Sequence, residues 1–482
     1  EPPRNAEPGE ESPVSQIRQG GTARVLLPEE PACMNPYLPE CGEAEALVGT
    51  VLEAPLAVGP SLGYRPLLAE QIPAYEAGTL SLEPLTVEVR LRAGIVFSNG
   101  EPLTSADVKW TYERAARLAE GGGIAPLYAG FGRLSRVETP DERTARLIFD
   151  EPYAFWRDLL AAPVLPRHVY EERDFGGLAL NREPVGSGPF LLEDRTEEID
   201  LVKNREYWAG EPLPDLEGME ISSPPPGAAA GSLSEGRSDF GFFVTTRALP
   251  DSGDLLRAAA APVRVENLLF NARRLDGTAR AAVARTIDRE RVAGEAGAPV
   301  ARSFVPPEFV PGYAPAWEDY GPSGSRGTAT PGEALDLVYS QESRNPVRDA
   351  VVGDLVSDLS GSGIGVEARP VSSGELFGEV LPEGDFDLAL FTGGPPAGYE
   401  VLLSSLPPEP RESLARTLGM LDTEERAQAL ARAQEQMAAQ DAVLPLFVWP
   451  DTMAWSSTLA GPRPETPYRG LMSNAREWAF YK

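Results

Sequence analysis

The pattern that most constrains the fold is an alternation of strand-like and helix-like segments between residues 80 and 150. Apolar residues recur at every second position in LTVEVRLR (residues 85–92) and again in ARLIFD (residues 145–150), which is the spacing of a strand with one buried face. Between them Thr104 and Asp107 form an S/T-x-x-D helix start, and apolar residues follow at helical spacing over residues 108–118. We therefore expect mixed α and β structure in this segment.

The rest of the chain has the same mixed character. Strand-like runs lie at residues 22–28 and 386–391, and amphipathic or helix-forming runs lie at residues 283–292, 347–359 and 423–440. Helices that alternate with short apolar strands favour an α/β architecture. The 482 residues suggest two or three domains, at roughly 100–200 residues each. Pro- and Gly-rich stretches at residues 221–231 and 321–332 predict surface loops.

The charge of the chain argues against polyanionic partners. Lys and Arg number 43 and Asp and Glu number 73, so the formal net charge is −30. This charge disfavours binding to nucleic acid or to an anionic membrane surface. It favours solubility, and selection of a cationic substrate stays open as the alternative. No apolar run approaches the ~18 residues that would suggest a membrane-spanning helix.

Residues 1–20 have the composition of a flexible tether. The segment EPPRNAEPGEESPVSQIRQG is rich in Pro, Glu and Ser and offers almost nothing to bury. A tether ahead of a globular body is what a surface-anchored protein needs to stand off a membrane. The chain starts at Glu1 without a visible signal peptide, which we interpret as a trimmed leader.

The two cysteines, Cys33 and Cys41, are expected to form a local disulfide. Pro36 and Pro39 between them favour a turning chain that could bring the thiols together. A metal site is a poor alternative, because two thiolates need further ligands and His168, the one histidine, is distant in sequence. A disulfide would place the protein outside the cytosol. Two unpaired buried thiols remain the alternative.

Motifs of enzymatic chemistry are scarce. The segment GSGIG (residues 361–365) resembles a dinucleotide-binding loop, but it follows a helix and precedes a strand, so a helix C-terminal turn is expected. Any Ser–His or Cys–His mechanism would have to use His168, for which we expect a structural or surface role. Asp385 and Asp387 are a possible acid/base pair, but Asp385 is expected to end the turn before the strand. We therefore expect no enzyme activity, no catalytic residue, no cofactor and no metal.

A series of longer motifs spans residues 22–482. The most specific is TVEVRLRAGIVFSNGEPLTSADVKWTYE (residues 86–113), and the others in chain order are NPY (35–37), RPLLAE (65–70), LPRHVY (165–170), PVGSGPF (184–190), KNREYWAGEP (203–212), LLFNARR (268–274), VARTIDRERVAG (283–294), GDFDLALF (384–391) and VLPLFVWP (443–450). In this order they resemble the family 5 extracellular solute-binding proteins, the peptide- and nickel-type binding components of ABC importers.

The resemblance implies an α/β, two-lobed, periplasmic-binding-protein-like (type II) fold with a hinge and an additional inserted α+β domain. Mapped onto this chain, the first lobe combines residues 21–50, 186–262 and 443–482, the inserted domain is 51–185 and the second lobe is 263–442, after the tether at 1–20. The segments VRVENLLFN and AVLPLFVWP are expected to be the two crossing strands of the hinge. Such hinges let a few residues absorb the closure of the lobes.

The resemblance also implies a function. The protein would be the periplasmic or extracellular component of an ABC transporter, capturing a small organic solute or peptide between two lobes and delivering it to the permease complex. We expect a monomer that binds no nucleic acid and is anchored to the outer face of the membrane as a lipoprotein, or lies in the periplasm. A secreted hydrolase, and a sensor or adhesin on the same binding fold, are the alternatives.

Four segments that follow apolar strand-like runs are expected to meet at the solute site, because ligands gather at the carboxyl ends of strands in open α/β sheets. The expected residues are Met34, Asn35 and Tyr37 in the first segment, Phe242, Phe243, Thr245 and Thr246 in the second, Thr392, Gly393, Gly394 and Tyr399 in the third, and Trp449 in the fourth. The alternative for the aromatic members, Phe243 and Trp449 in particular, is a place in the core.

One departure from the family pattern bears on the solute. Peptide-binding members tend to carry a Trp- and Asp-bearing loop after the strand that matches FDLALF, and the aspartate can hold the α-amino group of a peptide. Here that loop reads TGGPPAGYE (residues 392–400), with neither residue. Burying an ammonium group without a carboxylate partner is costly. We therefore expect a neutral or zwitterion-tolerant solute that is held by aromatic stacking and backbone hydrogen bonds.

Overall fold

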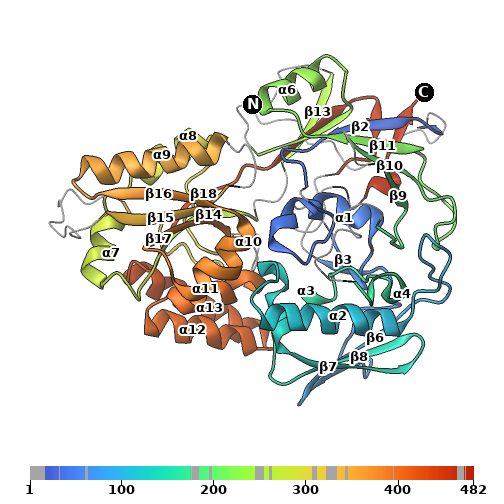
Figure 1. Cartoon of the computed structure of the whole chain (residues 1–482), viewed down its shortest axis with the longest axis horizontal. Coiled ribbons are helices and arrows are strands. Elements are labelled where there is room, and N and C mark those ends of the chain that lie inside the picture. The colour runs from blue at the N-terminus through green and yellow to red at the C-terminus, as the bar shows by residue number, and fades with distance from the viewer. Residues whose placement is uncertain are drawn as a thin grey trace.

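The structure, a computed structural model of the whole chain, describes most of the sequence (Figure 1). The described residues are 17–31, 33–59, 63–173, 175, 184–194, 198–244, 254–259, 263–306, 312–321, 334–341, 346–393, 396–463, 472 and 474–482.

A seven-stranded sheet combines strands from residues 22–259 with one strand, β19, from near the end of the chain. Its strand order is β13-β19-β12-β2-β11-β10-β9. The strands are β2 (Thr22–Leu26), β9 (Phe190–Asp194), β10 (Ile199–Lys203), β11 (Gly218–Ser222), β12 (Phe240–Phe243), β13 (Leu255–Ala259) and β19 (Thr452–Ser456). The predicted strand at residues 22–28 is β2, which runs parallel to both β11 and β12. A small sheet of β1 (Ile17–Arg18), β21 (Ala479–Tyr481) and β20 (Leu459–Ala460) lies beside it (Figure 1).

A five-stranded sheet forms the second body, with strand order β16-β15-β17-β14-β18. The strands are β14 (Val265–Phe270), β15 (Leu335–Ser340), β16 (Val366–Val371), β17 (Leu388–Gly393) and β18 (Val443–Val448). Helices α7 (Gly277–Ala284), α8 (Arg289–Ala296), α9 (Pro346–Gly361), α10 (Ser373–Glu375), α11 (Leu381–Glu383), α12 (Pro408–Gly419) and α13 (Thr423–Ala439) belong to this half of the chain. In Figure 1, α8 and α9 lie on one face of the sheet and α11 to α13 on the other.

The segment between β2 and β9 forms two further sheets. One has the order β5-β6-β8-β7 and the other pairs β3 with β4. Their strands are β3 (Leu56–Val58), β4 (Tyr64–Pro66), β5 (Leu80–Leu82), β6 (Leu85–Arg90), β7 (Leu134–Asp141) and β8 (Thr144–Phe149). The helices are α1 (Glu45–Val51), α2 (Ser105–Glu120), α3 (Trp156–Leu159), α4 (Arg167–Tyr170) and the 3-10 helices η2 (Pro39–Ala44) and η3 (Pro126–Arg133). The predicted start of α2 is confirmed, because Thr104 and Asp107 form the reciprocal hydrogen bonds of a capping box.

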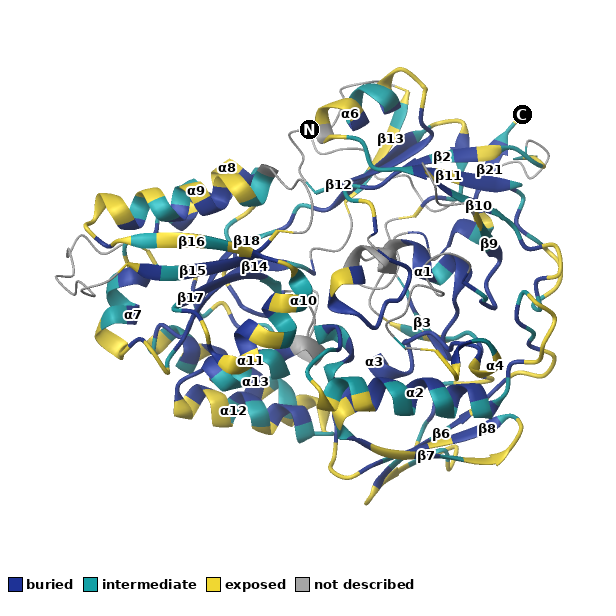
Figure 2. Ribbon diagram, in the orientation of Figure 1, coloured by how far each residue is buried: buried dark blue, intermediate teal, exposed yellow. Residues whose placement is uncertain are grey.

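Two apolar cores divide the molecule. One core runs without a break from the seven-stranded sheet through α1 into β6, β8 and α2, and the other surrounds the five-stranded sheet. Figure 2 shows the buried strands of each core and the exposed outer surfaces of α8, α9 and α12. The chain passes from β13 of one sheet to β14 of the other, and returns from β18 to β19. The two passages lie side by side, because Trp449 N donates to Arg264 O at 2.9 Å.

Several predicted elements need correction. Residues 283–292 are not one helix, because Asp288 caps a new helix, α8, with its side chain accepting from Arg291 N. The predicted loop at 221–231 contains the start of α6 (Pro226–Ser234), where Pro at the first helical position supplies the backbone angle. The predicted loop at 321–332 lies, apart from its first residue, outside the described residues.

Two boundaries of the predicted domains also shift. Ile17 and Arg18, placed in the tether, pair with Tyr481 and Phe480. Residues 443–448, placed in the first lobe, are β18 and pair with β14 of the five-stranded sheet. The other limits of the two lobes and the inserted domain stay a prediction. Within the described residues, no helix combines the length and apolar character that crossing a membrane requires.

Candidate functional site

The buried carboxylate of Glu266 binds several side chains at one end of the strands of the five-stranded sheet. This end lies next to the two segments that connect the sheets, from β13 to β14 and from β18 to β19. Glu266 lies near the start of β14, opposite Thr392 at the end of β17, and is fully buried. Its Oε2 accepts from Thr392 Oγ1 at 2.6 Å and from Trp449 Nε1 at 3.0 Å. Two of the residues predicted for the solute site are therefore joined through a residue that was not predicted.

Arg348 neutralises this carboxylate. Its Nε and Nη2 each donate to Glu266 at 3.2 Å, and its Nη1 donates to Ser340 Oγ at 2.8 Å. Arg348 lies in the first turns of α9, and Ser340 ends β15, which runs parallel to β17. Parallel strands end at the same edge, so Ser340 and Thr392 meet there. The paired guanidinium offsets the cost of burying the carboxylate.

Trp449 is fixed from the other side by a second ion pair. Arg264 donates to Asp451 through Nε at 2.9 Å and Nη2 at 2.5 Å, and Asp451 is buried. The Arg264 guanidinium also lies over the Trp449 ring, 5.5 Å from its centroid. Trp449 therefore sits between two charged pairs at the point where the chain changes sheets.

The predicted residues of the first segment lie in a different cluster. Met34, Asn35 and Tyr37 are fully buried. Asn35 Nδ2 donates to Phe175 O at 2.5 Å and Tyr37 Oη donates to Pro163 O at 2.6 Å, so both bind the segment predicted as the inserted domain. The predicted disulfide is present: Cys33 pairs with Cys41 and closes this loop, with their Cα atoms 5.1 Å apart.

The described part of the second predicted segment, residues 242–244, contacts more than one core. Phe242 packs in the core of the seven-stranded sheet, and Phe243 packs with Leu26 and Ala454 in a small cluster of its own. The next residue, Val244, contacts both large cores. Thr245 and Thr246 lie outside the described residues, as does Gly394 of the third segment.

Tyr399 and Gly393 complete the third segment. Tyr399, in the 3-10 helix η6 (Pro396–Ser405), is buried with its ring 4.7 Å from that of Phe304. Its hydroxyl has no hydrogen-bond partner among the described residues, and burial raises its pKa, so it stays protonated as a donor. At Gly393 an added Cβ would lie 2.8 Å from Nδ2 of buried Asn267, so a side chain there would force Asn267 to move.

The structure thus joins Thr392 and Trp449 through Glu266, and Gly393 follows Thr392 in the chain. It leaves Met34, Asn35 and Tyr37 in a separate cluster. The burial of the predicted aromatic residues fits an enclosed site and a core equally well, so their contact with a solute stays a prediction. Sequence reasoning missed Glu266 and Arg348. The available signal was Glu266 itself, a charged residue inside the apolar run VRVENLLFN, since such residues are almost never buried without a partner.

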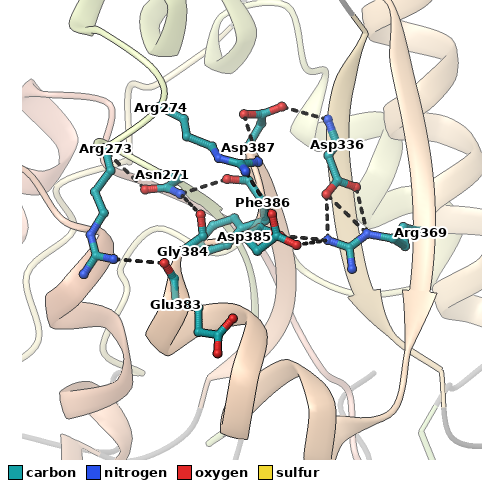
Figure 3. Close-up of polar contacts among 10 residues, drawn as sticks. All are labelled: Asn271, Arg273, Arg274, Asp336, Arg369, Glu383, Gly384, Asp385, Phe386 and Asp387. Atoms are coloured by element: carbon teal, nitrogen blue, oxygen red, sulfur yellow. Dashed lines mark hydrogen bonds and ion pairs between the residues drawn. The ribbon is translucent and has the colours of Figure 1, made fainter.

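The aspartates considered for acid/base chemistry lie at the opposite edge of the same sheet (Figure 3). Asp385 accepts from Arg274 Nη2 at 2.9 Å, and Asp387 Oδ2 accepts from Asp336 N at 2.9 Å at the start of β15. Arg369 binds Asp336 at 2.7 Å and the carbonyl of Asp385 at 2.7 Å. These contacts tie strand ends together.

His168 has the expected surface role, since its Nε2 lies 2.8 Å from Asn99 Nδ2 in an exposed contact. In the part of the chain that the structure describes, no group of three or more His, Cys, Asp or Glu is placed to hold a metal ion.

Residues 63–402 match the family described as "Bacterial extracellular solute-binding proteins, family 5 Middle". The chain belongs to this family. A curated relative, Protein XP55 of Streptomyces lividans, is 28% identical over 214 residues, which are 42% of this chain and 36% of that protein. The chain thus spans about a third of the length of this relative.

Solved structures share the fold of this family 5 protein. The oligopeptide-binding protein AppA from Bacillus subtilis, in complex with a nonapeptide, superposes with a TM-score of 0.79 at 18% identity, covering 97% of this chain and 100% of that chain. The periplasmic EDTA-binding protein EppA gives a TM-score of 0.78 at 17% identity, covering 97% and 98%. The expected two-lobed fold with a hinge and an additional domain is therefore confirmed.

Proposed function

We propose that this family 5 protein captures an organic solute or peptide between its two lobes and delivers it to the permease of an ABC importer. The proposal depends on the two connecting segments between the sheets, which are hydrogen-bonded to each other through Trp449 N and Arg264 O. Next to them, Trp449 binds Glu266 where the parallel strands β15 and β17 end. Two short passages let a few residues absorb the closure of the lobes around a solute. Family membership supports the same function.

The charges at this edge favour a solute without net charge. Glu266 is paired with Arg348 and Arg264 with Asp451. Residues 392–400 contain no aspartate, which peptide-binding members tend to carry at this place. We infer that a neutral or zwitterionic solute binds through aromatic packing, the Tyr399 hydroxyl and exposed backbone groups. The similar structures bind an oligopeptide and EDTA, so the fold accommodates chemically different solutes.

We propose that the protein lies outside the cytosol, either in the periplasm or anchored to the outer face of the membrane as a lipoprotein. The disulfide between Cys33 and Cys41 supports an oxidising compartment. Metabolic labelling of the full-length protein with palmitate, followed by membrane fractionation, tests the anchor. Unlabelled protein in the soluble fraction would contradict it.

Native mass spectrometry of freshly purified protein tests the binding function. We expect a fraction of molecules to carry a solute of defined mass, which unfolding releases for identification. The identified compound at 100 times its dissociation constant then stabilises the protein by about 2.7 kcal/mol. Trp449→Ala should abolish this gain, whereas Trp110→Ala, at a half-buried tryptophan of α2, should retain it. The function is refuted if no solute is found and no peptide, opine or metal chelate raises the melting temperature.

A further inference from the structure

The 3-10 helix η3 connects two of the predicted solute segments. At its start, Ala125 N donates to Tyr37 O at 2.8 Å, and the Tyr128 ring lies 5.0 Å from the Tyr37 ring. The same helix contacts η6, which carries Tyr399. One short helix of the inserted segment therefore touches the first-lobe loop and the second-lobe loop.

An ion pair joins η3 to η6. Arg133, the last residue of η3, donates through Nε to Glu400 Oε1 at 2.5 Å. The side chains are 24% and 18% exposed, so solvent screens this pair less than a surface pair. Glu400 directly follows Tyr399, and η6 begins three residues after the end of β17. The pair therefore holds the segment on which Thr392 and Tyr399 lie.

A second contact between the same parts lies next to this pair. Ala154 N donates to Leu418 O at 2.7 Å, where α12 ends, and the Arg426 guanidinium of α13 lies over the Phe155 ring at 5.5 Å. Figure 1 shows the inserted segment, with α2, beside α12 and α13. The inserted segment thus touches the second lobe away from the two passages of the chain.

A groove open to solvent borders this contact. It has a volume of about 570 Å³, and its lining includes Arg133, Glu400, Glu151 and Phe377. Solvent therefore reaches one side of the contact, at the place where Arg133 and Glu400 meet.

We propose that Arg133 is a positioning residue of the solute site. By pairing with Glu400 it latches the inserted segment to the second lobe, and it holds the two lobes in the closed arrangement even without a solute. The consequence for solute binding rests on the proposed function, whereas the latch itself is tested on solute-free protein. Loss of the latch shifts the population toward open molecules.

The distance between the lobes in solution tests this proposal. Spin labels are attached at Ser81→Cys in β5 and Ser357→Cys in α9, which are exposed in the two parts, while the disulfide keeps the native cysteines unreactive. Solute is removed by unfolding and refolding with the disulfide intact, and the label distances are measured by pulsed electron paramagnetic resonance. We expect a closed population, with Arg133→Glu lowering the closed-to-open ratio about tenfold.

Matched variants separate the latch from a general loss of structure. The double variant Arg133→Glu/Glu400→Arg, in which the two charges are exchanged, should restore most of the closed population. The variant Arg133→Lys keeps the positive charge and should keep the closed population of the wild type. Arg136→Glu is the control, because Arg136 lies three residues away and pairs with Glu138 of its own strand. If charge reversal unfolds the protein, Arg133→Gln removes the charge alone and should also favour open molecules.

Three results would overturn the latch. One is a refolded wild-type protein without a closed population. Another is an Arg133→Glu distribution equal to that of Arg136→Glu, and the third is an exchange variant that stays open. A failed solute search would refute the proposed function and leave these distances unchanged, so the two failures are distinguishable.

Discussion

Replacing Glu266 by Gln tests whether the buried ion pair organises the sheet edge. The side chain keeps its shape and one carbonyl oxygen, which at the position of Oε2 can accept from both Thr392 and Trp449. The bidentate contact with Arg348 is lost, and the guanidinium stays in place with its other contacts to Ser340 and Thr392. The cost therefore arises from an uncompensated charge and not from a cavity.

The size of the effect follows from the burial of the pair. Removing one partner of a fully buried ion pair costs about 3–5 kcal/mol. Arg348 is 15% exposed, so water reaches part of the guanidinium. We therefore expect Glu266→Gln to lower the free energy of unfolding by about 2–4 kcal/mol. The double variant with Arg348→Gln should cost less than the sum of the single variants, by about 1–3 kcal/mol.

Urea unfolding followed by tryptophan fluorescence, with calorimetry to separate the transitions of the two cores, measures this loss. Asp385→Asn is the control, since Asp385 pairs with Arg274 but is 63% exposed, and it should cost about 0–1 kcal/mol. A loss below about 1 kcal/mol for Glu266→Gln, or fully additive single variants, would refute the reasoning.

Three further outcomes are expected. Replacing Cys33 and Cys41 by Ala should lower the free energy of unfolding by about 2–3 kcal/mol, and the untreated wild-type protein should show no alkylatable thiol by mass spectrometry. Burial raises the pKa of Glu53 from 4.5 to about 7, despite hydrogen bonds from Tyr207 and Trp208, so the folded protein holds a proton that the unfolded chain has released. The free energy of unfolding should then fall by about 3 kcal/mol as the pH rises from 4.5 to 7. Urea titrations at several pH values measure this dependence, and Glu53→Gln should remove it. The same pH dependence in the variant would contradict the assignment. Tyr399→Phe should leave the melting temperature unchanged or raise the free energy of unfolding by up to about 1 kcal/mol, because no described residue accepts a hydrogen bond from its hydroxyl. The same variant should weaken the binding of an identified solute, measured by calorimetry.

Local patterns predicted the elements well where the deciding contacts are close in sequence. The strands at 85–92 and 145–150, the helix that starts after Thr104 and the turn after residue 361 were all found near the expected residues. The errors have local causes that were overlooked. Asp288 ends one helical stretch by capping the next, and Pro226 starts a helix within a segment that its composition marked as a loop.

The sequence by itself determined the α/β class and the order of the family motifs, and it predicted the disulfide and four candidate segments for the site. Only the tertiary structure decided which side chains meet. Glu266 is separated from Arg348 by 82 residues and from Trp449 by 183, and Arg133 is separated from Glu400 by 267. Helix caps and strand periodicity depend on neighbours within a few residues, so they can be recognised in the sequence. The pairing of buried charges depends on where distant strands end in space, and that is set by the order and direction of strands in the sheet.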